Sequence, residues 1–395
     1  MSDTSSKPMY EQIFEEVKRR IVSKAYGPGE RIPSEKQLAD EHGVSRITSK
    51  KALELLAGEG LIVRKPGKGS FVAEPESGGT DEAAVPDRAG KARPTVKTAG
   101  KPEMTTIGLI MTDFGNSYGT GLVYGMESAS RERDCFLVLR RSFGVPDQEE
   151  QSIRQLLQLG VDGLIVLPAQ GEYFNAEILK LVIRKFPLVL VDRHLKGVAA
   201  ASISTDNAAA AQKATEYLFG LGHERIAFVS PPPADTTAVE ERIEGFIRAH
   251  AERGVAVDRT LWATDLTSTL PSRFRDDNIE RDIAALTEHL RSKPAITALF
   301  ATEYNIALLA RKAAERLGLR VPQDVSIVCF DSPPTRLGEG YAFTHMRQDE
   351  ERMGRLAVEH VLRLRNGEPV PNKTMLEAEL VVGESTGPAA ETKTV

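Results

Sequence analysis

The chain has 395 residues, of which 41% are hydrophobic and 27% charged, and this composition is typical of a globular protein with two or three domains. Its net charge of −5 excludes a uniformly basic nucleic-acid-binding protein, and no apolar run approaches the roughly 20 residues that cross a bilayer. The N-terminal segment lacks the apolar stretch of a signal peptide, so we expect a cytoplasmic protein with no membrane partner.

The charge is divided unevenly along the chain. Residues 1–73 contain 13 Lys and Arg against 10 Asp and Glu, a net charge of +3 that leaves −8 for the remainder. A basic head on an acidic body favours one DNA-facing surface over indiscriminate binding to polyanions.

Helical periodicity begins near the N-terminus. Apolar residues at helical spacing predict an amphipathic helix over Met9–Ser23. Further on, Ser34 and Gln37 have the spacing of a capping box that begins a second helix. Gly43 then provides a turn, because only glycine adopts a left-handed conformation at little cost, and Ser45 caps a third helix.

A hairpin follows these helices. Residues 61–63 and 70–72 have the pattern of paired strands, and the basic, glycine-rich residues 65–69 connect them. Helix, turn, helix and hairpin in this order predict a winged helix-turn-helix. Its third helix places Arg46 and Lys50 on one face, where a helix of this width can enter the major groove of DNA.

The residues of this head resemble the GntR-type winged-helix family over about residues 7–73. The motifs that carry the resemblance are Tyr10-Glu11-Gln12-Ile13, Gly27-Pro28-Gly29, Ile32-Pro33-Ser34-Glu35, Gly43-Val44-Ser45-Arg46, Glu59-Gly60-Leu61-Ile62 and Gly67-x-Gly69-x-Phe71-Val72. The resemblance implies contacts with DNA from both helices and from the wing. With the basic neighbour Lys51 added, the predicted DNA-binding residues are Lys36, Ser45, Arg46, Thr48, Lys50, Lys51, Lys65, Gly67, Lys68 and Gly69.

Residues 74–103 differ in composition from both neighbours. They are rich in proline, glycine and charge and have almost no large apolar residues, so we predict a flexible linker between a head (residues 1–73) and a body (residues 104–388), with a tail over residues 389–395.

Two cysteines, Cys135 and Cys329, lie in apolar runs. We expect buried free thiols, with a disulfide as the open alternative.

The body alternates short apolar runs with helical stretches. This pattern predicts parallel sheets covered on both faces, and some 280 residues are better divided between two α/β lobes than placed on one sheet. Ligands bind such folds at the carboxyl ends of the strands. Polar residues recur there, and the candidates are Asp113 to Tyr118, Arg140, Arg141, Asp192, Arg193, Ser230 to Pro233, Glu303, Tyr304, Asp331, Ser332, Arg347 and Gln348.

The body resembles the LacI-type, periplasmic-binding-protein-like effector domain over roughly residues 105–388. Its motifs include Asp162-Gly163-Leu164-Ile165, Asp192-Arg193, Leu221-Gly222-His223-x-Arg225-Ile226, Arg242-x-x-Gly245-Phe246, Phe330-Asp331 and Thr344-x-x-Arg347-Gln348. By this resemblance, with Glu303 and Tyr304 in place of the family's usual Asn-Asp, the predicted effector-binding residues are Tyr118, Asp192, Arg193, Arg242, Glu303, Tyr304, Asp331 and Gln348.

A GntR-type head on a LacI-type body is the arrangement of arabinose-repressor-like regulators. It implies a homodimeric repressor of sugar-utilisation genes that binds a pseudo-palindromic double-stranded operator and is released by a small sugar such as a pentose. The alternatives are a regulator of a non-sugar ligand or co-repressor, a sugar receptor without DNA function, and an enzyme. We expect no metal, cofactor or catalytic residue, because the glycines at 119, 121 and 125 lack the spacing of a dinucleotide motif and no nucleophile or metal motif is present.

Overall fold

The computed structural model describes residues 9–23, 25–58, 61–65, 69–73, 104–115, 117–170, 175–234, 236–333 and 341–389. The chain divides into two compact units, Met1–Val96 and Lys97–Val395. The predicted linker, residues 74–103, lies outside the described residues, as does the predicted tail apart from Ala389. No helix of the described residues is long and apolar enough to cross a membrane.

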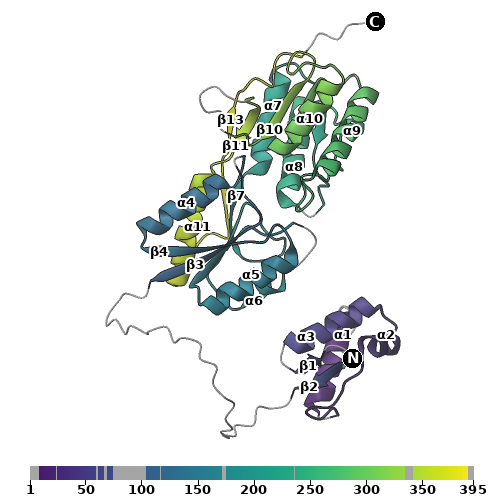
Figure 1. Cartoon of the computed structure of the whole chain (residues 1–395), viewed down its shortest axis with the longest axis vertical. Helices are drawn as coiled ribbons and strands as arrows, with labels where there is room; N and C mark the ends of the chain where they lie inside the picture. Colours follow the sequence, from purple (N-terminus) through teal and green to yellow (C-terminus); the bar gives the residue numbers. More distant parts are fainter. Residues whose placement is uncertain are drawn as a thin grey trace. The chain divides into compact units, whose positions relative to one another are not determined.

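The head has the predicted helices and wing. Its elements are α1 (Met9–Val22), α2 (Glu35–His42), α3 (Arg46–Gly58), β1 (Ile62–Lys65) and β2 (Gly69–Val72) (Figure 1). The capping box is present, because Ser34 and Gln37 each accept the other's backbone N–H. Gly43 ends α2 in the left-handed conformation, with φ 63°. Apolar faces of the three helices and the wing meet in one core that includes Ile13, Leu38 and Leu56.

The wing strands are longer than the sequence predicts. Lys65 and Gly69, which we expected in the loop, are opposite each other at the end of the antiparallel ladder. Gly69 has φ 112°, and a Cβ atom there would lie 2.9 Å from Nε of Arg31. The ladder and the Arg31 side chain together require glycine at this position.

We expect Gly69→Ala to destabilise the head. The left-handed backbone and the clash with Arg31 together cost roughly 1–3 kcal/mol, measurable as a lower midpoint of chemical unfolding. Gly27→Ala is the matched control, because the nearest atom to its Cβ would be Glu30 Oε2 at an ordinary 3.6 Å. Equal stability of the two variants would contradict the packing of Arg31 against the wing.

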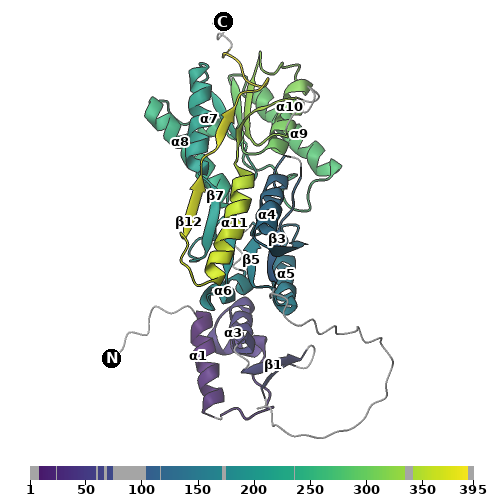
Figure 2. The same ribbon diagram turned by 90° about the vertical axis from the view of Figure 1, so that its left-hand side faces the viewer.

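The body consists of two three-layer α/β lobes (Figures 1 and 2). Within the described residues the first lobe has a parallel sheet in the order β12-β7-β6-β5-β3-β4. Its strands are β3 (Thr105–Met111), β4 (Cys135–Arg141), β5 (Gly163–Val166), β6 (Leu188–Val191), β7 (Ala201–Thr205) and β12 (Lys373–Leu376). Helices α4 (Thr120–Glu132) and α11 (Glu350–Arg365) cover one face, and α5 (Pro146–Leu159) and α6 (Ala176–Ile183) the other.

The second lobe repeats this design. Its described strands follow the order β13-β11-β10-β9-β8 and are parallel except for the edge strand β13. They are β8 (Ile226–Val229), β9 (Ala298–Ala301), β10 (Ser326–Phe330), β11 (Thr344–Arg347) and β13 (Glu379–Val381). Helices α7 (Asn207–Gly220) and α8 (Thr237–Arg253) cover one face, and α9 (Asp276–Ser292) and α10 (Tyr304–Arg316) the other.

The chain passes between the lobes at three places: after β7 at Asp206, after β11 at residues 348–349, and between β12 and β13 at residues 377–378. Helix α11 therefore returns to the first lobe, where it packs beside α4 (Figure 2). Gly125 and Gly354 allow this close approach, because a Cβ at either would overlap the backbone of the facing helix.

The buried cysteines have the predicted structural role, and the tryptophan is a core residue. Cys135 in the first lobe and Cys329 in the second are buried free thiols. Trp262 packs against Phe228 and Phe246 in the second lobe's core.

Candidate ligand site and nucleic-acid interface

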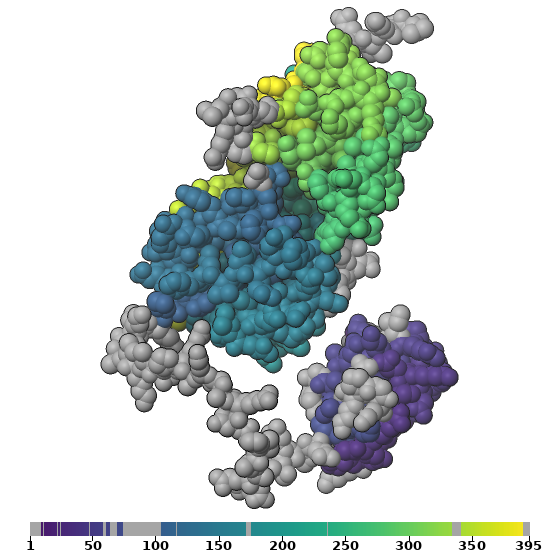
Figure 3. Space-filling view, viewed as in Figure 1, coloured from purple at the N-terminus to yellow at the C-terminus, as the bar shows by residue number. Residues whose placement is uncertain are grey.

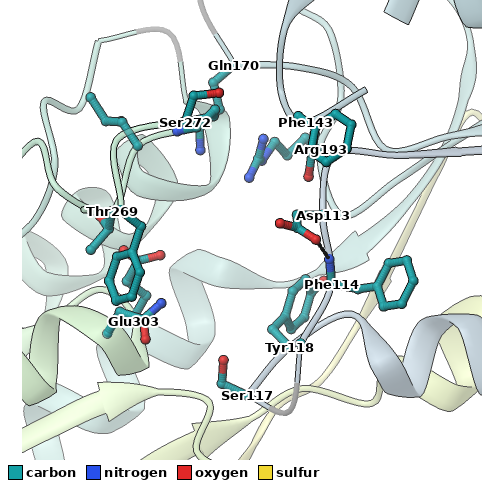
Figure 4. A pocket seen from close by; sticks show the side chains of 16 residues that line it. Asp113, Phe114, Ser117, Tyr118, Phe143, Gln170, Arg193, Thr269, Ser272 and Glu303 are labelled. Atoms are coloured by element: carbon teal, nitrogen blue, oxygen red, sulfur yellow. Dashed lines mark hydrogen bonds between the residues drawn. The ribbon is translucent and has the colours of Figure 1, made fainter. Parts of the chain in front are cut away.

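A cleft between the two lobes holds two connected chambers (Figure 3). The inner chamber has a volume of about 110 Å³ and the outer one about 530 Å³. Both are bordered by Ser117, Tyr118, Gln170, Arg193, Glu303 and Asn305. Figure 4 shows Asp113, Tyr118 and Arg193 of the first lobe along one side of the cavity, with Thr269 and Glu303 of the second lobe opposite.

All eight residues that the sequence predicted for the effector site line the inner chamber. Most follow directly from the fold, because the strand ends of two parallel sheets face each other across the cleft. Tyr304 contributes less than expected, since its ring packs edge-on against Phe343 at 5.9 Å between centroids in the second lobe's core.

The first lobe supplies a group of three interacting side chains, joined by one hydrogen bond and one ion pair. The Tyr118 hydroxyl donates to Asp192 Oδ1 at 2.5 Å, and Arg193 Nε lies 3.3 Å from Asp192 Oδ2. Burial, together with the neighbouring Asp192 carboxylate, raises the pKa of Tyr118 well above its usual value, so the phenol stays protonated. Asp192 has a left-handed backbone with φ 68°, which holds its carboxylate at the end of β6.

Arg242 on α8 is the principal buried cation of the second lobe. Its Nε donates to Asn207 Oδ1 at 2.9 Å and its Nη1 to the Thr302 carbonyl at 2.5 Å. The guanidinium lies 3.6 Å from the centre of the Phe330 ring. These contacts engage two of its five N–H groups, so a preoriented arginine retains donors for a ligand.

Asp331 of the second lobe contacts a segment of the chain that crosses between the two lobes. Gln348, where the chain crosses, donates from Nε2 to Asp331 Oδ2 at 2.8 Å and accepts from Thr205 Oγ1 at 2.6 Å. Burial raises the pKa of Asp331 to about 8, although the nearby Arg242 cation opposes this. Like Asp192, Asp331 has a left-handed backbone, with φ 58°. The site therefore stores backbone strain at the two carboxylates that end facing strands.

The raised pKa of Asp331 predicts a pH dependence of stability. The carboxyl of the unfolded chain ionises near its ordinary pKa of 3.8, whereas the folded one keeps its proton to about pH 8. Unfolding between these values releases a proton, so the free energy of unfolding falls as pH rises, by up to about 1.4 kcal/mol per pH unit. We expect Asp331→Asn to make this slope shallower between pH 5 and 7 in denaturant titrations.

Asp324→Asn is the control for this experiment. Its carboxylate is exposed and pairs with Arg320, which lowers the Asp324 pKa to about 2, so its titration lies below the tested window. An unchanged slope in Asp331→Asn would show that Asp331 is ionised in the folded protein.

Glu350 lines neither chamber, but it lies near Tyr118, and the sequence did not indicate its role. Its Oε2 accepts the backbone N–H groups of Gly119, Gly121 and Leu122 at the N-terminus of α4, at 2.7, 3.1 and 3.3 Å. The N-terminus of a helix normally attracts anions such as phosphate. Here the protein's own carboxylate occupies that position.

Loops supply the other lining residues that sequence reasoning missed. Gln170 follows β5, Asn305 begins α10, and Phe143 and Phe274 come from loops on opposite lobes. Only the unusual length of residues 264–277 was a usable signal.

Conversely, Arg140 and Arg347 were wrong as site candidates: Arg140 donates to Gln155 at 2.8 Å, and Arg347 pairs with Glu379 on the edge strand. Neither residue lines either chamber.

The head presents most of its predicted DNA-binding residues on α2 and α3. Lys36, Ser45, Arg46, Lys50 and Lys51 are exposed, and Thr48 is half-buried. The Ser45 and Thr48 hydroxyls lie 2.8 Å apart, and Ser45 Oγ caps α3 by accepting the Thr48 backbone N–H. The Lys51 ammonium lies 4.0 Å from the centre of the Tyr10 ring. Gly67, Lys68 and the Lys65 side chain lie outside the described residues.

Ser49 of α3 lies beneath this surface, where its hydroxyl needs a hydrogen-bond partner. It is fully buried, and its Oγ donates to the Glu35 carbonyl at 2.7 Å, which fastens α3 to the start of α2.

Within the described residues, one group has the spacing of metal ligands: Glu16, Glu41 and His42. Arg20 already pairs with both of its carboxylates, so this group is an ion-pair cluster of the head.

Two family models match the chain. Residues 9–72 match the model of bacterial regulatory proteins of the gntR family, and residues 215–386 match the periplasmic binding protein-like domain. The chain is thus built from a GntR-type winged-helix domain and a periplasmic-binding-protein-like α/β domain, as the sequence predicted.

Its relatives are transcriptional regulators. An arabinose metabolism transcriptional repressor of Geobacillus stearothermophilus is 26% identical over 386 residues, covering 96% of this chain and 98% of the relative. A repressor of the same description from Halalkalibacterium halodurans is 25% identical over 398 residues, covering 98% of both chains. The crystal structure of a LacI family transcriptional regulator from Mycobacterium smegmatis is 27% identical, with a TM-score of 0.59 over 71% of this chain and 99% of that one.

Proposed function

We propose that this protein is a sequence-specific DNA-binding repressor of sugar-utilisation genes that a small carbohydrate inducer releases from its operator. The observation that carries the proposal is the inner chamber, where donors and acceptors from two lobes converge: Arg242 and Gln348 donate, Asp192 accepts, and the protonated Asp331 can do either. A sugar hydroxyl both donates and accepts, so such a mixed lining suits a polyhydroxylated ligand. The same chain carries a GntR-type DNA-binding head.

The inducer is an unphosphorylated sugar. Glu350 occupies the N-terminus of α4 beside Tyr118, and its carboxylate would repel a phosphate there. Arabinose, named in the description of two relatives that match nearly the full chain, is the first candidate. Because it acts on DNA, the protein works in the cytoplasm.

The test is a titration of the full-length protein against labelled DNA from upstream of its own gene cluster, followed by fluorescence anisotropy. The titration is run over a salt series, with and without pentoses, hexoses and uronates. We expect tight, salt-sensitive binding that a neutral sugar releases. Binding equal to that of random DNA for every upstream fragment would contradict the repressor, and operator binding that no sugar shifts would contradict the inducer.

Induction operates by a shift between lobe arrangements. A ligand in the inner chamber contacts Tyr118 and Asp192 of the first lobe and Arg242 and Asp331 of the second, so it stabilises the arrangement that brings all four together. Across the same cleft, Lys373 pairs with Glu241 at 3.0 Å. The coupling is reciprocal: the operator weakens sugar binding by the factor by which sugar weakens operator binding.

The body forms a homodimer through the free edge of its first sheet. Strand β4 ends that sheet, and it exposes Phe136 (52%) and Leu139 (40%), with Tyr124 of α4 exposed nearby. An exposed edge strand with apolar side chains is a template for association. Twofold symmetry then presents two heads to a pseudo-palindromic operator, which raises affinity through effective concentration.

We expect Phe136→Glu to make the protein monomeric and to weaken operator binding at least tenfold, because a charge would be buried in the interface and the second head would be lost. Sedimentation velocity and anisotropy measure the two effects. Met375→Glu, half-exposed (50%) on β12 at the opposite edge, is the matched control. A Phe136→Glu protein that stays dimeric would exclude β4 from the interface.

A further inference from the structure

We propose that the inducer is a disaccharide or short oligosaccharide, with its first ring in the inner chamber and a second ring in the outer chamber. The inference rests on the proposed function and specifies the class of sugar. It follows from the size, the lining and the backbone of the outer chamber, which a single monosaccharide would leave unused.

The two chambers differ in volume. A cavity needs roughly 10–15 Å³ to hold one water-sized group. The inner chamber, at about 110 Å³, therefore holds on the order of ten such groups, the size of one sugar ring. The outer chamber, at about 530 Å³, has room for at least one more ring. The shared residues Tyr118, Arg193 and Glu303 form the passage where a glycosidic linkage would lie.

The linings differ in the way that two sugar subsites differ. The inner chamber is lined by charged and amide side chains, which select hydroxyl positions. The outer chamber adds three phenylalanines, Phe114, Phe143 and Phe274, together with Leu270 and Pro271. Flat apolar rings suit the C–H faces of a sugar, which they bury without fixing every hydroxyl. Phe143 and Phe274 remain 44% and 57% exposed, so their apolar surface is available to a ligand.

Phe143 is held in a position that its own backbone disfavours. Its φ is 52°, and a left-handed conformation at a bulky residue is an outlier that marks a functional constraint. Arg141 lies 4.4 Å from the centre of its ring and pairs with Asp113 at 2.8 Å, which restricts the motion of the ring.

The two loops that bear these rings meet across the cleft. A Cβ at Gly144 would lie 2.4 Å from Cγ of Pro271, so the first-lobe loop packs directly on the long second-lobe loop that precedes α9, residues 264–275. Ser272 in that loop also has a left-handed φ, 63°. The outer chamber is therefore built by residues of both lobes, and a second sugar ring there would contribute to lobe closure.

The outer chamber also holds buried polar groups next to the passage. Among the described residues, Glu303 Oε1 and Thr269 Oγ1 are buried and make no hydrogen bond of ordinary geometry, although the two side chains interact with each other. A buried acceptor without a well-formed hydrogen bond is costly, and a ligand hydroxyl at the linkage would satisfy it. This position lies beyond the ring bound by Asp331 and Gln348.

Isothermal titration calorimetry of the full-length protein tests the proposal with matched pairs: arabinose and arabinobiose, xylose and xylobiose, glucose and cellobiose. We expect one disaccharide to bind at least tenfold more tightly than its own monosaccharide. The double variant Phe143→Ala/Phe274→Ala should reduce the disaccharide affinity to about that of the monosaccharide. Leu159→Ala, exposed on α5 and outside both chambers, is the control and should retain the full difference.

The outcomes separate this inference from the proposed function. A monosaccharide that binds as tightly as its disaccharide, and releases the operator, would overturn the inference and leave the sugar-controlled repressor intact. A disaccharide advantage that survives the double variant would overturn the assignment of the second ring to the outer chamber. Failure of all six sugars to bind would contradict the proposed function itself.

Discussion

Arg46→Ala is expected to weaken operator binding by about 1–3 kcal/mol, roughly 5- to 150-fold, and to reduce discrimination between operator and random DNA. Arg46 is the first residue of α3 and is exposed, and within the described residues no ion pair of its side chain is found. The N-terminal end of a recognition helix approaches the base edges, where an arginine can donate two hydrogen bonds to guanine. Anisotropy with operator and scrambled DNA measures both quantities.

The control for Arg46 must remove a positive charge without touching the head. Arg253→Ala does so, because Arg253 is exposed at the end of α8 in the second lobe. A general loss of positive charge would weaken both variants equally and would lower affinity for all sequences alike. Loss of operator affinity in Arg46→Ala with unchanged discrimination would make Arg46 a phosphate contact instead of a base contact.

Arg242→Met is expected to abolish induction while leaving operator binding intact. Methionine keeps much of the apolar stem beside Phe330 but removes every donor. Hydrogen bonds from a charged group contribute about 1.5–3 kcal/mol each, so the loss of two to a sugar corresponds to at least a hundredfold higher sugar concentration for half-release. Sugar titrations of the protein–operator complex measure this shift.

Buried arginines also stabilise folds, so this variant needs its own controls. Arg248→Met lies on the same helix but is exposed and pairs with Glu244. Circular dichroism shows whether Arg242→Met is folded, and operator binding shows whether the head is active. Simultaneous loss of structure and operator binding would assign Arg242 a folding role through Asn207 and Thr302.

The fold was predictable wherever local chemistry matches the final structure. Ser34, Gln37 and Gly43 determine the start and end of α2 by themselves. Continuous apolar runs predict buried strands, and Leu188–Val191 is such a run, buried along its whole length. Strand β7 lacks this pattern because its buried positions include Ser202 and Ser204, and β12 and β13 lack it because edge strands are largely exposed.

The site was predictable only in part, for a topological reason. Strand ends converge in any two-lobed parallel fold, so Asp192 and Asp331 follow from the pattern. Glu350 reaches the N-terminus of α4 only because α11 returns to the first lobe, some 230 residues further along the chain. Phe143 depends on a left-handed backbone in a loop, which no periodicity in the sequence indicates.

The three passages of the chain between the lobes have a consequence for synthesis on the ribosome. The first sheet receives β12 only when residues 373–376 have been made, whereas the head is complete once residue 73 has left the exit tunnel. At about 5–20 residues per second, roughly 15–60 s separate these events. During that interval a nascent chain has a folded DNA-binding head but an incomplete ligand-binding body. A dimer formed by the completed body would keep such single-headed chains from competing for the operator.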